Sequence, residues 1–225
     1  MTTTVRELRT VREFAEVHAL FDAIWHPGPG SAPAPVELMV ALAHAGGYVA
    51  GAYEGGELVG ASVGFLAEGG ALHSHITGVL RPGGGVGYAI KMHQRAWCLE
   101  RGLTTVTWTF DPLVRRNAYF NIAKLGARPR EYLEDFYGPM GDAVNAGDVS
   151  DRLLVAWRLA GEEPPPAGPT VLVPTPEDVE ALRARDPAEA RRWRLALRET
   201  LGGLMAEGGK VIGFTKEGQY VAIKG

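Results

Sequence analysis

A glycine-rich segment between a predicted strand and a predicted helix is the part of the sequence best suited to binding a ligand. The apolar and β-branched run over residues 72–80 predicts a strand, and residues 88–101 predict a helix. A helix N-terminus offers free N–H groups and the positive end of the helix dipole. Glycine lets the backbone approach a ligand closely and take positive φ. The segment is therefore expected to bind a phosphate or pyrophosphate group. Its glycines are Gly83, Gly84, Gly85 and Gly87.

Two histidines in the predicted strand are candidates for proton transfer. His73 and His75 are two residues apart, so in a regular strand they lie on one face, together with Thr77 and Val79. Histidine titrates near neutral pH, which suits His75 as a general base and His73 as a contact to substrate. Hydrogen bonding within the sheet is the alternative role for both. The pair has no clear third ligand, so a metal site is not expected.

Three further polar residues suit acid–base or substrate-binding roles. Asp111 ends a predicted strand and precedes Pro112; it could cap the next segment, or act in amine recognition and proton relay. Arg152 follows Ser150-Asp151 and could bind a substrate carboxylate through two hydrogen bonds, with an Asp–Arg structural pair as the alternative. Tyr137 is a candidate to close over the acceptor substrate.

Hydrophobic periodicity and turn residues predict the elements that would position these groups. Thr10 and Glu13 have capping-box spacing, so a helix is expected from there to Trp25, stopping before His26. Further helices are expected over residues 36–44 and 113–125. Strands are expected over residues 4–8, 48–53, 58–65, 104–110, 128–133 and 152–159. The resulting order is β-α-α-β-β-β-α-β-α-β-β.

A proline-rich linker over residues 161–169 divides the chain into a domain of residues 1–160 and a C-terminal unit of residues 161–225. In that unit we expect a strand at 170–173, a helix starting after Thr175 with Asp178 closing its cap, and a longer helix from Asp186 to Ala206. A terminal hairpin is expected over residues 211–215 and 220–224.

The charge pattern of the C-terminal helices predicts a solvated face, because arginines alternate with acidic residues. These arginines are Arg183, Arg185, Arg191, Arg192, Arg194 and Arg198. The apolar stripe of Trp193, Leu197, Leu201 and Leu204 is expected to pack on the first domain or on a second subunit. A homodimer is therefore one expectation.

The composition is that of a soluble globular protein, with 46% hydrophobic and 22% charged residues among 225. A net charge of −3 argues against nucleic-acid binding, which usually needs a basic surplus. Charges throughout residues 1–25 argue against a signal peptide or a membrane span. The single Cys98 rules out an internal disulfide framework and fits a reducing compartment. We therefore expect a cytoplasmic protein with neither nucleic acid nor membrane as a partner.

The order strand, glycine loop, helix, strand and a helix ending in KLGA resembles the GNAT superfamily of acyl-CoA N-acyltransferases. The resemblance spans about residues 4–159. It is carried by residues 79–87, by Asn117-Ala118 and by residues 124–127. Residues 107–127, 132–138 and 145–157, with ALRARDP and Trp193-Arg194 beyond them, are similar to an uncharacterised GNAT subfamily with a C-terminal extension. The resemblance implies an α/β fold, in which helices cover both faces of a mixed, mostly antiparallel sheet of six or seven strands.

The resemblance also implies acetyl-CoA or another acyl-CoA as co-substrate, and no metal. GNAT proteins hold the pyrophosphate on a pattern Arg/Gln-x-x-Gly-x-Gly/Ala, whose last part is matched by residues 85–87. The first position of that pattern falls on Pro82, with Arg81 one residue out of register. Coenzyme contacts are accordingly expected from Thr77, Val79, Arg81, Gly83, Gly84, Gly85, Val86, Gly87, Tyr88 and Asn117. A backbone N–H near Thr77 to Val79 would stabilise the oxyanion.

Many GNAT proteins protonate the departing thiolate with a tyrosine at the position occupied here by Ile122. Tyr119 lies one turn earlier and is the candidate acid in this chain. The implied function is transfer of an acetyl or succinyl group to a small-molecule amine, with an amino acid as one candidate, by direct attack. The proline-rich segment 26–35 and the C-terminal unit favour a closed site. Acylation of a protein or peptide, and a non-catalytic coenzyme A sensor or scaffold, are the alternatives.

Overall fold

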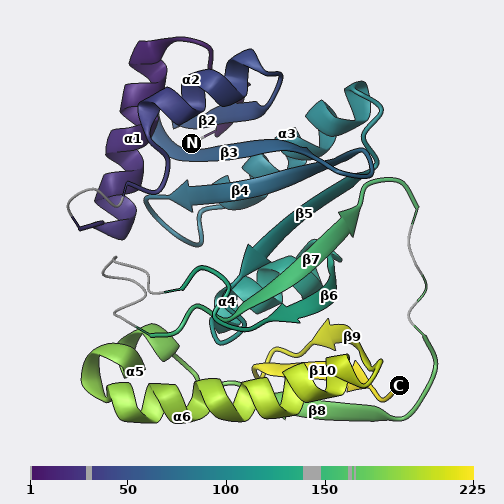
Figure 1. Ribbon diagram of the computed structural model, residues 1–225. Helices are drawn as coiled ribbons and strands as arrows, with labels where there is room; N and C mark the ends of the chain where they lie inside the picture. The colour runs from purple at the N-terminus through teal and green to yellow at the C-terminus, as the bar shows by residue number, and fades with distance from the viewer. Residues whose placement is uncertain (1, 29–31, 139–147, 162–163, 165) are drawn as a thin grey trace. The chain divides into compact units, whose positions relative to one another are not determined.

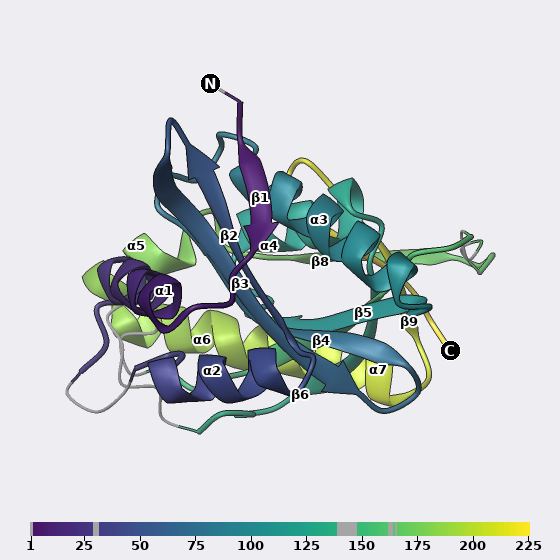
Figure 2. The ribbon, with the colours of Figure 1, turned by 90° about the horizontal axis from the view of Figure 1, so that it is seen from above.

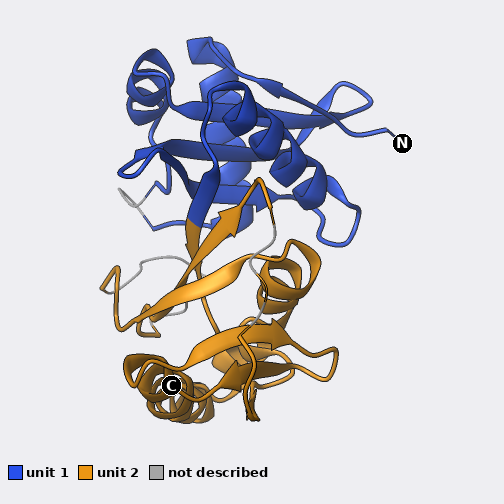
Figure 3. Cartoon of the chain, turned by 90° about the vertical axis from the view of Figure 1, so that its right-hand side faces the viewer, with its two compact units in different colours: residues 1–107 blue, residues 108–225 orange. Residues whose placement is uncertain are grey.

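The computed structural model describes residues 2–28, 32–138, 148–161, 164 and 166–225 (Figure 1). The chain forms two compact units, Met1–Thr107 and Trp108–Gly225 (Figure 3). Strand β5 (Thr105–Phe110) runs through this division. The boundary expected near residue 160 stays a prediction.

Seven strands form one sheet in the order β1-β2-β3-β4-β5-β7-β6. Neighbouring strands from β1 to β4 are antiparallel, as are β6 and β7, whereas β4 and β5 run parallel. The predicted mixed, mostly antiparallel sheet is therefore confirmed. The other strands of this sheet are β1 (Thr4–Glu7), β2 (Tyr48–Glu54), β3 (Glu57–Ala67), β4 (Ala71–Val79), β6 (Arg128–Leu133) and β7 (Arg152–Arg158).

Helices cover both faces of the first unit's part of the sheet (Figure 2). Helices α1 (Val11–Trp25) and α2 (Val36–His44) pack on one face, and α3 (Val86–Glu100) packs on the other. Two neighbouring residues of β4 show these layers. A Cβ at Gly78 would lie 2.6 Å from the Trp25 ring of α1, whereas Val79 packs in a cluster with Val86 of α3.

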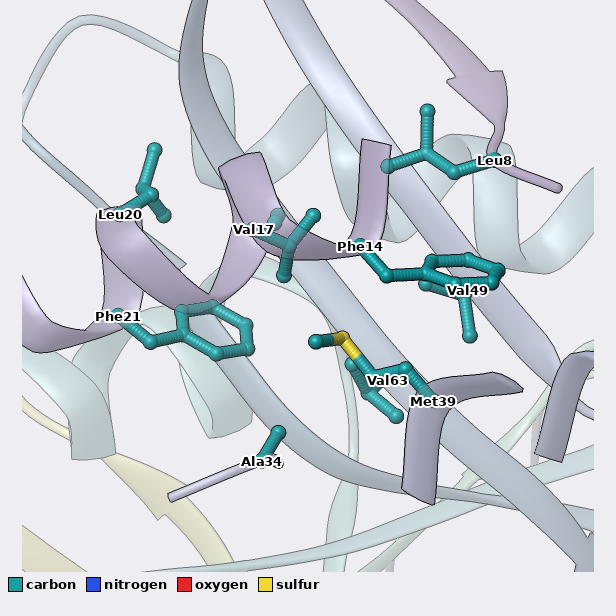
Figure 4. Packing of buried hydrophobic residues seen from close by; sticks show 10 residues of the cluster. Leu8, Phe14, Val17, Leu20, Phe21, Ala34, Met39, Val49 and Val63 are labelled. Atoms are coloured by element: carbon teal, nitrogen blue, oxygen red, sulfur yellow. The ribbon is translucent and has the colours of Figure 1, made fainter. Parts of the chain in front are cut away.

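The face beneath α1 and α2 holds a hydrophobic core in which every third or fourth residue of α1 is buried (Figure 4). Helix α1 begins at the predicted capping box, since the Thr10 hydroxyl accepts a hydrogen bond from the Glu13 N–H and the Glu13 carboxylate accepts one from the Thr10 N–H. The buried members of this core are Leu8, Phe14, Val17, Leu20, Phe21, Ala34, Met39, Val49, Ala61 and Val63.

In the second unit, helix α4 (Arg115–Ala118) continues into the wider π-helical turns of η1 (Tyr119–Lys124). Strands β8 (Thr170–Pro174), β9 (Lys210–Phe214) and β10 (Gln219–Ile223) form a separate antiparallel sheet, which confirms the terminal hairpin and adds a third strand to it. The remaining helical segments are α5 (Val179–Arg185), α6 (Pro187–Leu197), η2 (Arg198–Gly202) and α7 (Gly203–Ala206).

One predicted helix start is wrong. Helix α5 begins at Val179 because Asp178 is its N-cap and accepts a hydrogen bond from the Ala181 N–H. The Thr175 hydroxyl instead donates to the backbone oxygen of Gly218. The second predicted start is confirmed, since Asp186 caps α6 and is followed by proline. Across the described part of the chain, the helices are too short or too polar for a membrane span.

Candidate functional site

The glycine loop leads directly into α3 and has backbone conformations that favour glycine. Gly83 and Gly85 have φ of +95° and +85°, values that favour glycine. Gly85 is the N-cap of α3, and the first helical bond runs from the Ala89 N–H to the Gly85 oxygen, 2.9 Å away. A Cβ added at any of the four loop glycines would meet nothing within 4 Å. Space is therefore open beside each of these glycines at the N-terminus of a 15-residue helix, the kind of position that binds phosphate groups in proteins.

The predicted coenzyme contacts around this loop differ in exposure. Arg81 and Tyr88 are exposed beside it. The side chains of Val79 and Val86 pack in the hydrophobic cluster with Ile90, so any ligand contact there would come from their backbone. Roles in coenzyme binding stay predictions for all of these residues.

A β-bulge interrupts β4 in the middle of the predicted catalytic strand. His73 lies opposite Phe65 and Ile76 lies opposite Val63, so two residues, Ser74 and His75, lie between them where β3 has one. The extra residue reverses the alternation of side chains beyond the bulge. The side chains of β4 before and after the bulge therefore do not follow one continuous alternation between the two faces of the sheet.

The histidines remain together on one side of β4. Their ring centroids are 6.4 Å apart, and both rings approach the ring of Phe65. Burial lowers the pKa of both histidines, and His75 and Lys91 lower that of His73 further. The His73 Nδ1 lies 3.0 Å from the Thr107 hydroxyl. The pair is therefore neutral at neutral pH, the form that accepts a proton.

The expectation that Thr77 and Val79 share the face of the histidines is wrong. Thr77 hydrogen-bonds to side chains of the opposite face, and Val79 packs toward α3. The physical reason is the bulge, because a period of two applies only to an uninterrupted strand.

Beneath the bulge, on the side of α3, five polar side chains form a hydrogen-bonded network that the sequence analysis missed. They are Ser62, Ser74, Thr77, Lys91 and Gln94. Lys91 is 4% exposed, and its Nζ donates to the Ser74 hydroxyl at 3.0 Å. Burial lowers the pKa of Lys91 to about 7. Helical spacing is the signal that could have found it, since Lys91 lies three and seven residues from the buried Gln94 and Cys98.

Asp111 lies in a buried cluster of charges in the second unit. Its carboxylate accepts the Leu113 N–H and two hydrogen bonds from Arg194, at 2.7 and 2.8 Å, and pairs with Arg183. Asp148 pairs with the same two arginines. Burial alone would raise the pKa of Asp111, but Arg194 and Arg183 hold it well below its usual range. These contacts favour the structural alternative, and a role in amine recognition stays a prediction.

The predicted solvated face of C-terminal arginines is wrong at two positions. Arg194 is fully buried and Arg183 is 4% exposed. Both belong to the Asp111 cluster, because α5 and α6 turn these side chains toward buried carboxylates. Arg198 is partly exposed and binds Asp151. The other three arginines of the set are exposed, as predicted.

The structure brings two predicted substrate contacts together. The Arg152 guanidinium lies 5.5 Å from the centre of the Tyr137 ring, and the Tyr137 hydroxyl lies 3.0 Å from that of Thr109. Arg152 is 7% exposed, while Tyr137 is 41% exposed. The two could form a positive, aromatic contact for a carboxylate.

The predicted acid and the last coenzyme contact lie on the α4–η1 segment. Tyr119 is 38% exposed at the first position of η1. Ile122 is buried, so the position that carries a tyrosine in many GNAT proteins belongs here to the core. Asn117 is half-buried, and its N–H donates to the oxygen of Val114, the N-cap of α4. No group of three or more His, Cys, Asp or Glu side chains in the described residues could hold a metal ion.

Comparisons with known proteins locate this fold among acetyltransferase structures. No protein-family model and no curated protein matches the sequence. A GNAT-family protein from Desulfovibrio desulfuricans is 14% identical, with a TM-score of 0.55 over 71% of this chain and 100% of that one. The ribosomal-protein-S18-alanine N-acetyltransferase from Escherichia coli is 12% identical, with a TM-score of 0.55 over 74% of this chain and 99% of that one.

A third solved structure, from Salmonella typhimurium, contains acetyl-CoA. It is 14% identical and has a TM-score of 0.56 over 74% of this chain and 99% of that one. At such identities the likeness shows the fold alone. The chain therefore has the fold of the GNAT acetyltransferases.

Proposed function

We propose that this chain is an acyl-CoA-dependent N-acyltransferase in which an amine attacks the thioester directly. The supporting observation is the cradle of Gly83, Gly84, Gly85 and Gly87 at the N-terminus of α3, directly after β4, in a chain with the GNAT fold. Backbone N–H groups and the helix dipole there suit the coenzyme's pyrophosphate. Arg81 adds an exposed positive charge beside the loop. Bound acyl-CoA would supply the activated thioester.

Direct attack on a thioester needs a group that takes the amine proton and donors for the oxyanion. We assign the first role to His75, whose lowered pKa keeps it neutral and able to accept a proton. His73 beside it is the proposed contact to the acceptor. The oxyanion donor is proposed to be a backbone N–H near Thr77 to Val79. The roles of Tyr119 as acid and of Asp111 in amine recognition and proton relay stay predictions, which mutation of each residue tests.

The acceptor is proposed to be a small amine, and Arg152 with Tyr137 favours one that carries a carboxylate. An amino acid meets that description. We propose residues 1–160 as the acyl-CoA-binding domain and residues 161–225 as an extension that packs on it or on a partner subunit. The cytoplasm is the proposed compartment, and a homodimer is the proposed assembly.

The test is release of free thiol from acetyl-CoA and from succinyl-CoA, each with separate pools of amino acids and other amines. Release with one pool supports the proposal and identifies the class of acceptor and donor. Thermal stabilisation by coenzyme A without release from any pool would instead favour a sensor. If coenzyme A gave no thermal stabilisation and no pool gave thiol release, the assignment of the glycine loop would be refuted.

A matched pair of variants tests whether coenzyme A binds at the glycine loop. At Gly87 an added side chain meets open space, and φ lies outside the left-handed region. Gly87→Glu should leave the fold intact, since an acidic residue is favourable in a first helical turn. It should weaken coenzyme A binding by about tenfold or more, because roughly 1.4 kcal/mol of repulsion suffices for that factor. Gly87→Gln has the same size without the charge and should bind nearly as the wild type does.

A protein or peptide amine is the second candidate acceptor. The observation in its favour is that one solved neighbour is named as an N-acetyltransferase of a ribosomal protein's alanine. N-terminal peptides of varied sequence, added to the same thiol-release assay, distinguish it from a small-molecule acceptor.

A further inference from the structure

The polar network beneath β4 has a direction that follows from counting its hydrogens. Ser62 donates its only hydroxyl hydrogen to the Ile76 oxygen, 3.1 Å away. Ser62 must therefore accept in its 2.8 Å contact with Thr77, so the Thr77 hydroxyl donates to it. Thr77 then has acceptor positions left for the Ser74 hydroxyl, at 3.4 Å, the longest contact of the network.

Ser74 receives hydrogens from α3. The Lys91 Nζ donates to the Ser74 Oγ at 3.0 Å, and the Gln94 Nε2 donates to it at 2.9 Å. With two donors facing its oxygen, Ser74 turns its own hydrogen toward Thr77. The order of donation is therefore Lys91 to Ser74 to Thr77 to Ser62, whose hydroxyl donates to the Ile76 oxygen. A side-chain ammonium stands at the start of a chain of hydroxyl groups.

Thr77 is the most accessible member of this network, and its other members are buried. Lys91 is 4% exposed and Ser74 is 3% exposed. Thr77 is half-buried. It lies three residues before Leu80, and a strand rises about 3.3 Å per residue, so it is about 10 Å along β4 from the loop. The pantetheine arm that connects the pyrophosphate to the sulfur of coenzyme A is longer than this distance.

We propose that Lys91 stores the proton taken up by the departing thiolate and delivers it through Ser74 and Thr77. The inference rests on the proposed acyltransferase function. As the amine nitrogen bonds to the acyl carbon and the carbon–sulfur bond breaks, the Thr77 hydroxyl turns from Ser62 to the sulfur and gives it its proton. Thr77 regains one from Ser74, and Ser74 regains one from the Lys91 ammonium, which becomes a neutral amine. The proton lost by the attacking amine goes to His75, which releases it to solvent after product release, and Lys91 takes up a proton from solvent through the same hydroxyls.

Lys91 suits this task because it can lose and regain a proton near neutral pH, given its pKa of about 7. An exposed lysine would hold its proton too tightly to donate it efficiently. The position that carries an acid in many GNAT proteins is the buried Ile122. The network therefore provides a proton donor for the thiolate. Its residues belong to β4 and α3, the strand and helix on either side of the glycine loop.

The first experiment compares kcat for thiol release in Lys91→Met, Thr77→Val and a matched control, Thr105→Val. Thr77→Val removes the hydroxyl at nearly constant volume, and Thr105 is a half-buried threonine on the neighbouring strand. Both network variants should lose about 100-fold in kcat, the usual contribution of a general acid. The control should keep the wild-type kcat. Thr77→Val tests the same relay at a second position, without removing the buried charge.

A pH profile separates proton storage from a structural role of the charge. In the wild type, kcat should fall above about pH 7 as Lys91 loses its proton. In Lys91→Arg the positive charge stays at every pH, so a purely structural role of the charge would keep the wild-type kcat and extend it above about pH 7. Proton storage instead predicts a low kcat in Lys91→Arg even below about pH 7, since arginine does not release its proton in this range.

An NMR experiment gives a readout that does not depend on turnover. With ¹⁵N-labelled lysine, coenzyme A should shift the Lys91 Nζ signal in the wild type and leave it unshifted in Thr77→Val. Wild-type kcat in both network variants, or a loss confined to Tyr119→Phe, would overturn the inference while leaving the acyltransferase proposal intact. Absence of thiol release from the wild type with every acceptor would instead overturn the proposed function.

Discussion

Replacing Lys91 by methionine should make the protein more stable at neutral and acidic pH, although it removes a hydrogen bond. The reason is the cost of burying an ammonium group. Lys91 is 4% exposed, and burial moves its pKa from an ordinary 10.5 to about 7. That shift corresponds to about 5 kcal/mol at 1.36 kcal/mol per pH unit. The loss of the Ser74 hydrogen bond costs about 1 kcal/mol in the other direction.

The sign of the pH dependence follows from proton binding. Between pH 7 and 10.5 the unfolded chain binds a proton at this lysine that the folded protein has lost, so the wild type becomes more stable as the pH rises. Lys91→Met lacks this effect. Its advantage over the wild type should therefore shrink by about 3 kcal/mol between pH 6 and pH 9.

Urea unfolding of both proteins at pH 6, 7, 8 and 9 measures the difference directly. Lys216→Met is the matched control, because Lys216 is exposed in the β9–β10 turn. The control should differ from the wild type by the same amount at every pH. A difference for Lys91→Met that stays constant over this range would refute the reasoning, since the lysine would then titrate alike in the folded and unfolded protein.

Three predictions concern packing and buried polar groups, each measured by urea unfolding. Gly78→Ala should lose about 1–3 kcal/mol of stability, because the new Cβ would lie 2.6 Å from the Trp25 ring. Asp111→Asn should lose about 3–5 kcal/mol, because two buried guanidinium groups would then share Asp148 as their one remaining counter-charge in the cluster, and an unchanged midpoint would contradict the ion pairs. Tyr220→Phe should lose about 1–3 kcal/mol, because the buried Pro112 oxygen would lose its 2.6 Å hydrogen bond.

Local signals in the sequence predicted most of the elements. The capping box at Thr10 and Glu13 and the N-cap at Asp186 placed helix starts correctly, because each cap needs only residues close in sequence. The glycine loop was recognisable for the same reason. Thr175 mimicked such a cap but hydrogen-bonds to Gly218, a partner 43 residues away that no local pattern reveals.

The features missed from the sequence depend on contacts between distant segments. The bulge at Ser74 and His75 leaves the composition of β4 unchanged, so a regular strand was expected. Lys91 and Arg194 have the charge of surface residues but are buried. Their spacing relative to apolar neighbours on α3 and α6 was the available signal. A charged side chain predicts a surface position, because buried cations are rare without partners. The partners of these two residues lie elsewhere in the chain.

The charge cluster at Asp111 binds the C-terminal segment non-covalently to the part of the chain around Asp111. Arg183 and Arg194 reach Asp111 from across the exposed linker, and Tyr220 donates to the Pro112 oxygen. The described residues of segment 160–169 are all exposed, as protease-sensitive linkers are. A chain cut there should therefore stay associated as a two-piece complex, and a C-terminal piece supplied separately should reassemble with the rest.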